Sequence, residues 1–383
     1  NVAIATQRIE RDTLVNSPEG QFTIQHTILE GHRFVLHPTN AGQPLLSWGL
    51  PFGTAIRNLR PGEYVCNEKI LTALAQRAID FDLPSQANFV DVMLEHHIDK
   101  TSFSPGQQVR RSNERKSFLG YRRPERRGVG TRNFIVILAV TVKSAAFARQ
   151  IESKYSSRDL GGNIDGVIAV THTEGDGTLA PNNFSVVMRT LAGFMIHPNV
   201  GAVQVVDYND GTFTANDLKQ FALDNDYPLD QTLHEFLNIT GSSEPTLMNA
   251  SETIDQWIPI VGKASRTEES VENISLALQC GGSDAFSGIS GNPLAGAVAK
   301  EVIRCGGKAN LAETDELIGA ESYVLSNVKD LSTAQMFLKK IKDFKQYAAN
   351  HGVSAEGNPS GGNNYRGLYN IALKSIGAAR KKD

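Results

Sequence analysis

Short apolar runs alternate with helix-like segments between Asn133 and Asp224, and this alternation limits the possible fold more than any other feature. Strands are expected over 133–142, 166–170 and 200–206, and helices over 144–157, 184–194 and 216–224. Two later apolar runs, 274–278 and 308–311, complete the set, and each precedes a further expected helix. Alternating strands and helices predict an α/β fold with a parallel sheet covered on both faces. Ligands of such sheets bind beyond the carboxyl ends of the strands, where this chain carries polar clusters.

The chain before this region has a different pattern. Residues 22–71 form short runs broken by Gly, Pro and Asn, which predicts a small all-β module ending in a short helix over 70–79. Residues 110–130 contain seven arginines and one lysine, which is typical of a solvated linker or an anion-facing loop. We therefore predict a β-rich domain over 1–83, a basic linker over 84–127 and a mostly parallel-sheet α/β body over 128–383.

The overall composition argues against several classes of protein. A formal charge of −3 argues against a general nucleic-acid binder, and no apolar run is long enough to span a bilayer. The first residues carry charges where a signal peptide needs an apolar core. Three cysteines make no disulfide framework, and no CxxC pair suggests structural zinc. We expect a cytoplasmic protein that binds a small molecule, with no nucleic-acid or membrane partner; a homo-oligomer is compatible with these features.

The sequence lacks a P-loop, a G-x-S-x-G motif and a G-x-G-x-x-G motif after the first expected α/β strand. Kinase, serine hydrolase and dehydrogenase functions are therefore disfavoured. His32 lies alone among expected strands, where a histidine is more often structural than catalytic.

A glycine-rich loop follows the strand expected over 274–278. Cys280, Ser283 and Asp284 place a thiol, a hydroxyl and a carboxylate within five residues, next to Gly281 and Gly282. Glycines allow a close approach of the backbone to a ligand, and the free N–H groups at a helix start bind anions. A tight strand-to-helix turn with a capping Ser or Asp explains the same residues equally well.

The segment THTEGDGT, residues 171–178, follows another expected strand and contains His172, Glu174 and Asp176. Alternate residues of an extended segment point the same way, so these three side chains can converge. They suit a divalent cation such as Fe²⁺, Mn²⁺ or Mg²⁺, or a general base beside its acid partner. A solvated turn is the alternative.

Two further clusters lie nearer the end of the chain. Glu313 precedes the expected helix cap Thr314 and is a better site candidate than Asp315 and Glu316, whose positions in the first helical turn favour them as helix-stabilising acids. A Gly/Pro-rich loop carries carboxamides, a hydroxyl and an arginine that can hold a polyhydroxy acid, although the residues alone favour an ordinary surface loop. Its polar residues are Asn358, Ser360, Asn363, Asn364 and Arg366.

These motifs together resemble the altronate/galactarate dehydratase family of sugar-acid hydro-lyases. The matching segments occur in order over almost the whole chain: GHRFVL, GLPFGTAIRNLRPGEYV, GYRRPERRGVGTRNFIVI, GVIAVTHTEGDGT, LQCGGSDAFSGISGNPLAG, NLAETDELIGAE and GNPSGGNNYRGLYNIALKSIG. The resemblance implies an N-terminal SAF (β-clip) domain, a dehydratase body and an activity that depends on a divalent metal, Fe²⁺ first and Mn²⁺ or Mg²⁺ next.

The chain departs from the family in two respects. Family members usually carry cysteine where this chain has Ser144 and Asp176, and an oxygen ligand at Asp176 favours Mn²⁺ or Mg²⁺ more than a thiolate would. Members also continue past the helix that ends here in GAARKKD, so we expect the chain to be truncated at its C-terminus relative to the family.

The resemblance implies removal of water from an aldonic or aldaric acid, giving a 2-keto-3-deoxy acid. The implied catalytic residues are His172, Glu174, Cys280 and Asp284, and the implied metal ligands are His172, Asp176 and Glu313, with Glu174 as a further candidate. The implied substrate-binding residues are Gly281, Gly282, Ser283, Asn358, Ser360, Asn364 and Arg366. Two alternatives are a non-catalytic relative that binds a sugar acid and a lyase that eliminates another group such as sulfite.

Overall fold

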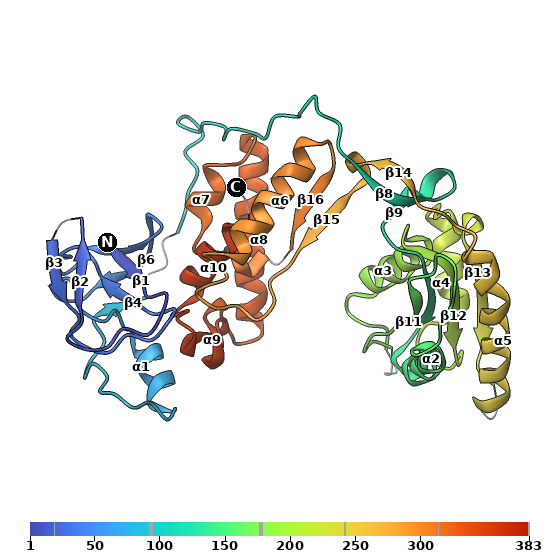
Figure 1. The fold of residues 1–383 in the computed structure, drawn as a ribbon, viewed down its shortest axis with the longest axis horizontal. Helices are drawn as coiled ribbons and strands as arrows, with labels where there is room; N and C mark the ends of the chain where they lie inside the picture. The colour runs from blue at the N-terminus through green and yellow to red at the C-terminus, as the bar shows by residue number, and fades with distance from the viewer. Residues whose placement is uncertain (19, 92–94, 176–178, 241–242, 313, 382–383) are drawn as a thin grey trace. The chain divides into compact units, whose positions relative to one another are not determined.

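The computed structural model describes residues 1–18, 20–91, 95–175, 179–240, 243–312 and 314–381. The chain forms two compact units (Figure 1): Asn1–Asn113 together with Ser275–Asp383, and Glu114–Ile274. The expected mixed α/β fold with a small N-terminal β module is confirmed. The grouping differs from the predicted segments, because the residues expected as one body over 128–383 are divided between the two units.

The first unit begins with a β module of short antiparallel strands. β1 pairs with β4, β2 with β3, and β6 with both β5 and β7. The elements are β1 (Val2–Ile4), β2 (Leu14–Ser17), β3 (Gly20–Thr23), β4 (Arg33–Val35), β5 (Pro44–Ser47), β6 (Leu50–Ala55), α1 (Glu68–Ala75) and β7 (Phe89–Val90). Strands β1 and β2 lie before residue 22 and were not predicted from the sequence. The helix expected over 70–79 begins earlier, because Asn67 caps it by accepting a hydrogen bond from Ile70 N.

The same unit contains the C-terminal third of the chain, which is mostly helical. Its elements are β15 (Ser275–Leu278), α6 (Gly291–Arg304), β16 (Lys308–Leu311), α7 (Glu321–Leu325), α8 (Leu331–Asn350), α9 (Gly361–Tyr365) and α10 (Ile371–Ala379), with single 3-10 turns η4 (Thr314–Leu317) and η5 (Ala355–Gly357). Helix α10 is buried along its whole length, and Leu373 and Ile376 join a core with Ile24, Leu45 and Phe52 of the β module. The two parts of this unit therefore share one hydrophobic core.

Strands β15 and β16 pair in parallel as a separate two-stranded sheet. The sequence analysis expected them in the same sheet as the earlier strands, and that expectation was wrong. Both strands are short, and Ser275 and Ala277 of β15 are exposed while Leu276 and Leu278 are half-buried. Such alternation is typical of a strand with one covered face, whereas a central parallel strand is buried on both.

The second unit is built on a four-stranded parallel sheet in the order β11-β10-β12-β13. Its elements are β10 (Phe134–Ala139), α2 (Val142–Tyr155), β11 (Gly166–Val170), α3 (Phe184–Ile196), β12 (Val200–Asp207), α4 (Ala215–Asp224), β13 (Leu233–Asn238) and α5 (Ser243–Val261), with the 3-10 turn η2 (Leu229–Gln231). Ile135 and Ile137 of β10 pack in one core with α2 and α5, and Val136 and Leu138 pack in another with α3 and α4. Burial on both faces explains why this strand is an unbroken apolar run.

The second unit also contains a small antiparallel sheet with the strand order β14-β8-β9. Its elements are β8 (Ser117–Arg122), η1 (Glu125–Arg127), β9 (Val129–Gly130), β14 (Thr267–Ser270) and η3 (Val271–Asn273). Arg127 is 5% exposed and donates hydrogen bonds to the carbonyl oxygens of Ile196, His197 and Val200 at 3.0, 2.8 and 2.6 Å. The arginines of this segment thus belong to the folded unit, and the solvated-linker interpretation was wrong for residues 117–127.

Within the part of the chain that the structure describes, no helix combines the length and the apolar character needed to cross a bilayer.

Candidate functional site

The glycine-rich loop lies between β15 and α6, as the sequence predicts. Its side chains interact with one another: Cys280 Sγ contacts Ser283 Oγ, and Asp284 Oδ1 accepts hydrogen bonds from Ser287 N at 2.8 Å and Ser287 Oγ at 3.0 Å. Ser283 is buried, and its carbonyl oxygen accepts a hydrogen bond from Asn363 Nδ2 at 2.6 Å. The loop is therefore tied to α9, which lies far away in the sequence.

A cavity of about 260 Å³ opens beside this loop, and we call it the Cys280 cavity. Four of its lining residues, Cys280, Gly281, Ser283 and Asn358, are predicted site residues. The cavity is completed by residues from η4, α9 and α10, namely Asp315, Glu316, Asn363 and Lys374. It thus combines one thiol, two carboxylates, two carboxamides and one ammonium group.

A buried ion pair forms one wall of the Cys280 cavity. Glu316 is 2% exposed, and its carboxylate contacts Lys374 Nζ and lies 3.3 Å from Lys381 Nζ. Burial by itself raises the pKa of Glu316, but the two ammonium groups outweigh it and the net pKa is lowered. Glu316 is therefore a carboxylate at neutral pH.

The pKa of the Cys280 thiol is raised, whereas that of Glu316 is lowered. Burial raises the pKa of the thiol above the ordinary value, and the neighbouring Glu316 carboxylate raises it further, against a smaller opposing effect of Ser283 and Lys381. The thiol is thus held protonated at neutral pH. In this state Cys280 can donate a proton and is a poor nucleophile.

Glu316 was predicted to be a helix-stabilising acid, and Lys374 was not predicted as a site residue. A signal for Lys374 was present, because it is the one charged residue of the apolar segment IALKSIGAA, which is the whole of α10. A lysine in such a segment needs a buried partner. The partner itself could not be read from the sequence.

The remaining predicted residues of this unit lie elsewhere. Asp284 and Arg366 line a second cavity of about 450 Å³, the Arg366 cavity, together with Arg8, Glu30 and Tyr365. Ser360 caps α9, because Ser360 Oγ donates to Asn363 Oδ1 at 2.8 Å. Gly282 lines neither of these two cavities.

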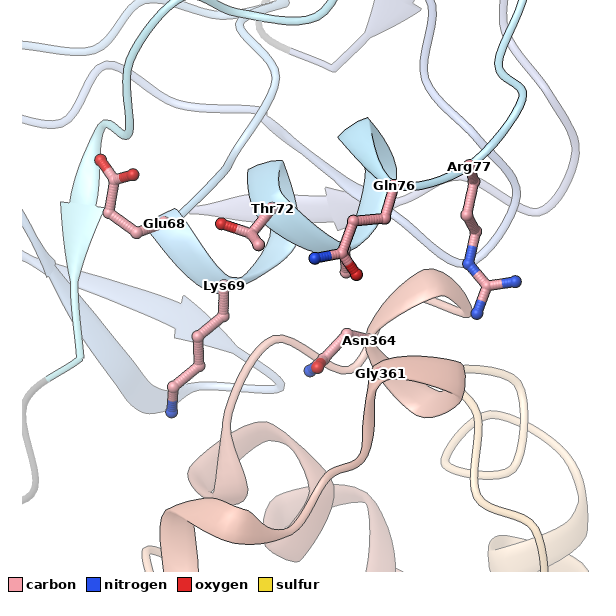
Figure 2. Close-up of a pocket in the computed structure, with 8 residues that line it drawn as sticks. Glu68, Lys69, Thr72, Gln76, Arg77, Gly361 and Asn364 are labelled. Carbon is pink, nitrogen blue, oxygen red and sulfur yellow. The ribbon is translucent and has the colours of Figure 1, made fainter.

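Asn364 lines a third cavity, of about 520 Å³, between α1 and α9 (Figure 2), which we call the α1–α9 cavity. Figure 2 shows Thr72 of α1 and Gln76, which follows α1 directly, on one side of this cavity, and Asn364 and Gly361 of α9 on the other. The amide nitrogen of Asn364 donates to Leu368 O at 2.7 Å, so this side chain also holds the turn that follows α9. Five of the seven predicted substrate-binding residues are therefore spread over three cavities around α9 and the glycine-rich loop.

His172 and Glu174 lie in the second unit, after β11. His172 Nε2 donates to Val140 O at 2.9 Å, and Nδ1 accepts from Glu174 N at 3.2 Å. Both ring nitrogens thus bind main-chain atoms, and His172 can accept a proton only by releasing Glu174 N. Ser144, where the family usually has cysteine, is fully buried and donates to Thr141 O at 3.0 Å.

The predicted metal ligands are only partly covered by the structure. Asp176 and Glu313 fall outside the described residues. Among the residues that are described, no three His, Cys, Asp or Glu side chains come close enough together to hold a metal ion. These residues alone do not make a metal centre, and the iron, manganese or magnesium ion stays a prediction.

Comparison with known proteins gives consistent matches along the chain. Residues 1–73 match the altronate/galactarate dehydratase SAF domain, residues 120–262 the D-galactarate dehydratase/altronate hydrolase second domain, and residues 271–383 the D-galactarate/altronate dehydratase C-terminal domain. Altronate dehydratase of Escherichia coli (strain K12) is 28% identical over 389 residues, covering 100% of this chain and 72% of the relative. Altronate dehydratase of Bacillus subtilis (strain 168) is 25% identical over 384 residues, covering 100% and 71%.

A third relative has a different name. The (2R)-sulfolactate sulfo-lyase subunit beta of Chromohalobacter salexigens is 27% identical over 268 residues, covering 70% of this chain and 64% of the relative. The three domain matches and the altronate dehydratase relatives define the class of this protein as a hydro-lyase. The chain belongs to the altronate/galactarate dehydratase family of hydro-lyases.

Proposed function

We propose that the chain removes water from a hydroxylated sugar acid of the altronate or galactarate class and releases a 2-keto-3-deoxy acid. The observation that carries this proposal is the match of the whole chain to two altronate dehydratases. The Cys280 cavity supports it, because its side chains are those that an elimination from a polyhydroxy acid needs.

The reaction has two proton transfers, and the Cys280 cavity contains a group for each. Asp315 takes the proton from C2, next to the substrate carboxylate, and the electron pair of that C–H bond is first held on the carboxylate as an enediolate, which then forms the C2–C3 double bond. The C3–O bond breaks, and the departing hydroxyl takes the proton of the Cys280 thiol and leaves as water. The resulting enol rearranges to the 2-keto acid, and the proton on Asp315 returns to the thiolate through solvent.

The other residues of the cavity bind and stabilise. In this proposal the Lys374 ammonium binds the substrate carboxylate, on which negative charge develops, and Glu316 fixes the position of Lys374. Asn358, Asn363 and Ser283 provide hydrogen bonds to hydroxyl groups. His172 and Glu174, which belong to the other unit, and Arg366, which lines a separate cavity, take no part in these two proton transfers.

The test separates the two proton transfers. The wild type is incubated with a panel of aldonic and aldaric acids in D₂O, with keto acid measured by derivatisation and C2–H exchange by NMR. We expect Asp315→Asn to lose both signals by about a hundredfold or more, and Cys280→Ala to lose keto acid while retaining C2–H exchange. Lys339→Met, in an exposed ion pair on α8, is the control and should behave as the wild type.

Absence of keto acid from every substrate with the wild type would overturn the proposal. Equal loss of exchange in both variants would overturn the separate roles of Asp315 and Cys280.

A second candidate function is elimination of sulfite from a sulfonated hydroxy acid. The match to a sulfo-lyase subunit over 70% of this chain favours it. The chemistry is the same except that sulfite leaves from C3 and needs no proton from an acid. Ion chromatography of the same reactions distinguishes the two, because only this candidate yields sulfite.

A further inference from the structure

Helix α9 and the turn that follows it connect the three cavities. Asn363 lines the Cys280 cavity, Asn364 the α1–α9 cavity, and Arg366 the Arg366 cavity. The segment 363–368 contains no strand, and α9 is only five residues long. Local structure alone therefore gives little stability to the residues that shape these cavities.

Hydrogen bonds from distant residues hold this segment. His32 Nε2 donates to Tyr365 O at 2.9 Å, and Arg33 Nη1 donates to Gly367 O at 2.8 Å, across 333 and 334 residues of chain. Ala285 N, in the glycine-rich loop, donates to Arg366 O at 3.1 Å. Three consecutive carbonyl groups are thus each bound by a donor from elsewhere in the unit.

The backbone of the β module also packs directly against this turn. A Cβ atom at Gly31 would lie 2.9 Å from Arg366 O, and one at Gly367 would overlap the carbonyl oxygen of Gly31. Both glycines have positive φ angles, +81° and +86°. Only glycine permits this approach without strain, so the two chain segments lie in van der Waals contact.

The surroundings of His32 fix its Nε2 atom as a hydrogen-bond donor. His32 is fully buried, and its Nδ1 lies 2.5 Å from the Tyr64 hydroxyl, which donates to it, so the ring proton is on Nε2. Burial also lowers the pKa of His32 to about 4, which keeps the ring neutral. The ring can therefore donate only in the direction of Tyr365 O.

Arg33 is a second fixed donor. It is fully buried, its main-chain N donates to the Tyr369 hydroxyl at 2.8 Å, and the rings of Trp48, Phe52 and Tyr369 surround its guanidinium group at 5.7–5.9 Å. A buried guanidinium group is costly unless hydrogen bonds and aromatic faces compensate for lost water. Burying a cation to bind this one turn costs free energy, which indicates that the position of the turn matters for the site.

We propose that His32 and Arg33 of the β module are positioning residues for the site formed by the C-terminal part of the chain. They hold the carbonyl groups of Tyr365 and Gly367, and the same segment holds the glycine-rich loop through Asn363 and Arg366. The β module thus acts on Cys280 and Ser283 without touching the substrate. This inference rests on the proposed function for its link to substrate, but its physical part can be tested without any substrate.

The first measurement is hydrogen–deuterium exchange of the full chain, followed at the amides of Asn364, Arg366, Gly367 and Leu368. His32→Leu removes the donor to Tyr365 O, and we expect these amides to exchange roughly two- to tenfold faster. His32→Gln retains a donor at similar reach and should restore slow exchange. Arg33→Lys, which keeps the charge but changes the geometry, should show a smaller increase.

The control is Asn88→Ala, which removes hydrogen bonds to Tyr64 O and Cys66 N inside the β module and none to the segment 363–368. It should leave these amides unchanged. Wild-type exchange rates in a folded His32→Leu variant, or equal acceleration in Asn88→Ala, would overturn the proposal whether or not the wild type dehydrates a sugar acid.

The second measurement is steady-state kinetics with an acid that the wild type turns over. His32→Leu should raise KM and lower kcat/KM by at least about tenfold, and His32→Gln should recover most of the loss. An unchanged KM together with faster exchange would overturn the link to substrate binding. Failure of the proposed function would appear separately, as a wild type without turnover.

Discussion

Lys374 and Glu316 form an ion pair in which both side chains are almost completely buried, 8% and 3% exposed. Lys381, 4% exposed, is the second cation on the same carboxylate. Removing the carboxylate leaves two buried ammonium groups without a partner. The pair thus sets both the stability of α10 and the charge of the Cys280 cavity.

We predict that Glu316→Gln lowers the free energy of unfolding by about 3–5 kcal/mol. The double variant Glu316→Gln with Lys374→Met should recover part of this loss, because one unpaired charge is removed. Urea unfolding measures both. Lys339→Met, which breaks the exposed pair with Asp343, should leave the free energy of unfolding almost unchanged. A similar small effect for Glu316→Gln would contradict the buried pair.

The Cys280 thiol should react slowly with iodoacetamide at neutral pH, because burial and the Glu316 carboxylate raise its pKa. Glu316→Gln removes the negative charge and lowers the pKa, so the alkylation rate at Cys280 should increase severalfold. Peptide mapping separates Cys280 from Cys66, whose pKa is raised by burial to about 12. Slower alkylation of Cys280 in the variant would show that the carboxylate does not control the thiol.

Acid should destabilise the first unit through His32. Burial lowers its pKa from 6.5 to about 4. Above pH 6.5 the ring is neutral in both states, and below it the unfolded chain binds a proton that the folded chain does not. The free energy of unfolding should therefore fall by about 3 kcal/mol as the pH drops from 6.5 toward 4.

The measurement is urea unfolding over this pH range. His32→Gln should remove most of the slope, leaving the contribution of His26 in the same unit, whose pKa burial also lowers. A variant with the full wild-type slope would mean that His32 is not the titrating group.

Arg127 should be essential to the stability of the second unit, whereas its neighbour Arg126 should not. Arg127→Met leaves the carbonyl groups of Ile196, His197 and Val200 without this donor, and we expect a loss of about 3 kcal/mol or more. Arg126 is exposed and pairs with Asp226, so Arg126→Met should leave the stability almost unchanged. Thermal unfolding of the two variants compares them, and equal effects would refute the structural role of Arg127.

The family resemblance predicts a divalent metal, and chelation tests it. Activity should disappear after EDTA treatment and dialysis, and Fe²⁺ should restore it better than Mn²⁺ or Mg²⁺. Substitution of Asp176 or Glu313 by alanine should lower the amount of metal bound per chain, measured by atomic emission. Full turnover in the presence of the chelator would contradict the predicted metal dependence.

Local patterns in the sequence predicted much of the fold. Strands β11 and β16 have the expected limits, and β10, β12, α2 and α4 differ by a few residues at their ends. These elements are long or strongly apolar, so residues close together in the sequence determine where they begin and end. Strands β1 and β2 were missed because each is only three or four residues long, with exposed or half-buried side chains.

The candidate site could be predicted only in part. Cys280, Gly281, Ser283 and Asn358 were recognised from residue type and spacing, and the structure places them around one cavity. Glu316 and Lys374 were not recognised, because the role of each depends on its ion pair with the other, and 58 residues separate them.

The sequence by itself determined which segments are strands and helices, and which loops carry reactive side chains, because these depend on residues a few positions apart. Tertiary structure decided that β15 and β16 form their own sheet, that Arg127 is an internal donor, and that Gly31–Arg33 hold the turn after α9. Burial and ion pairing depend on residues brought together across hundreds of positions, and no local pattern specifies them.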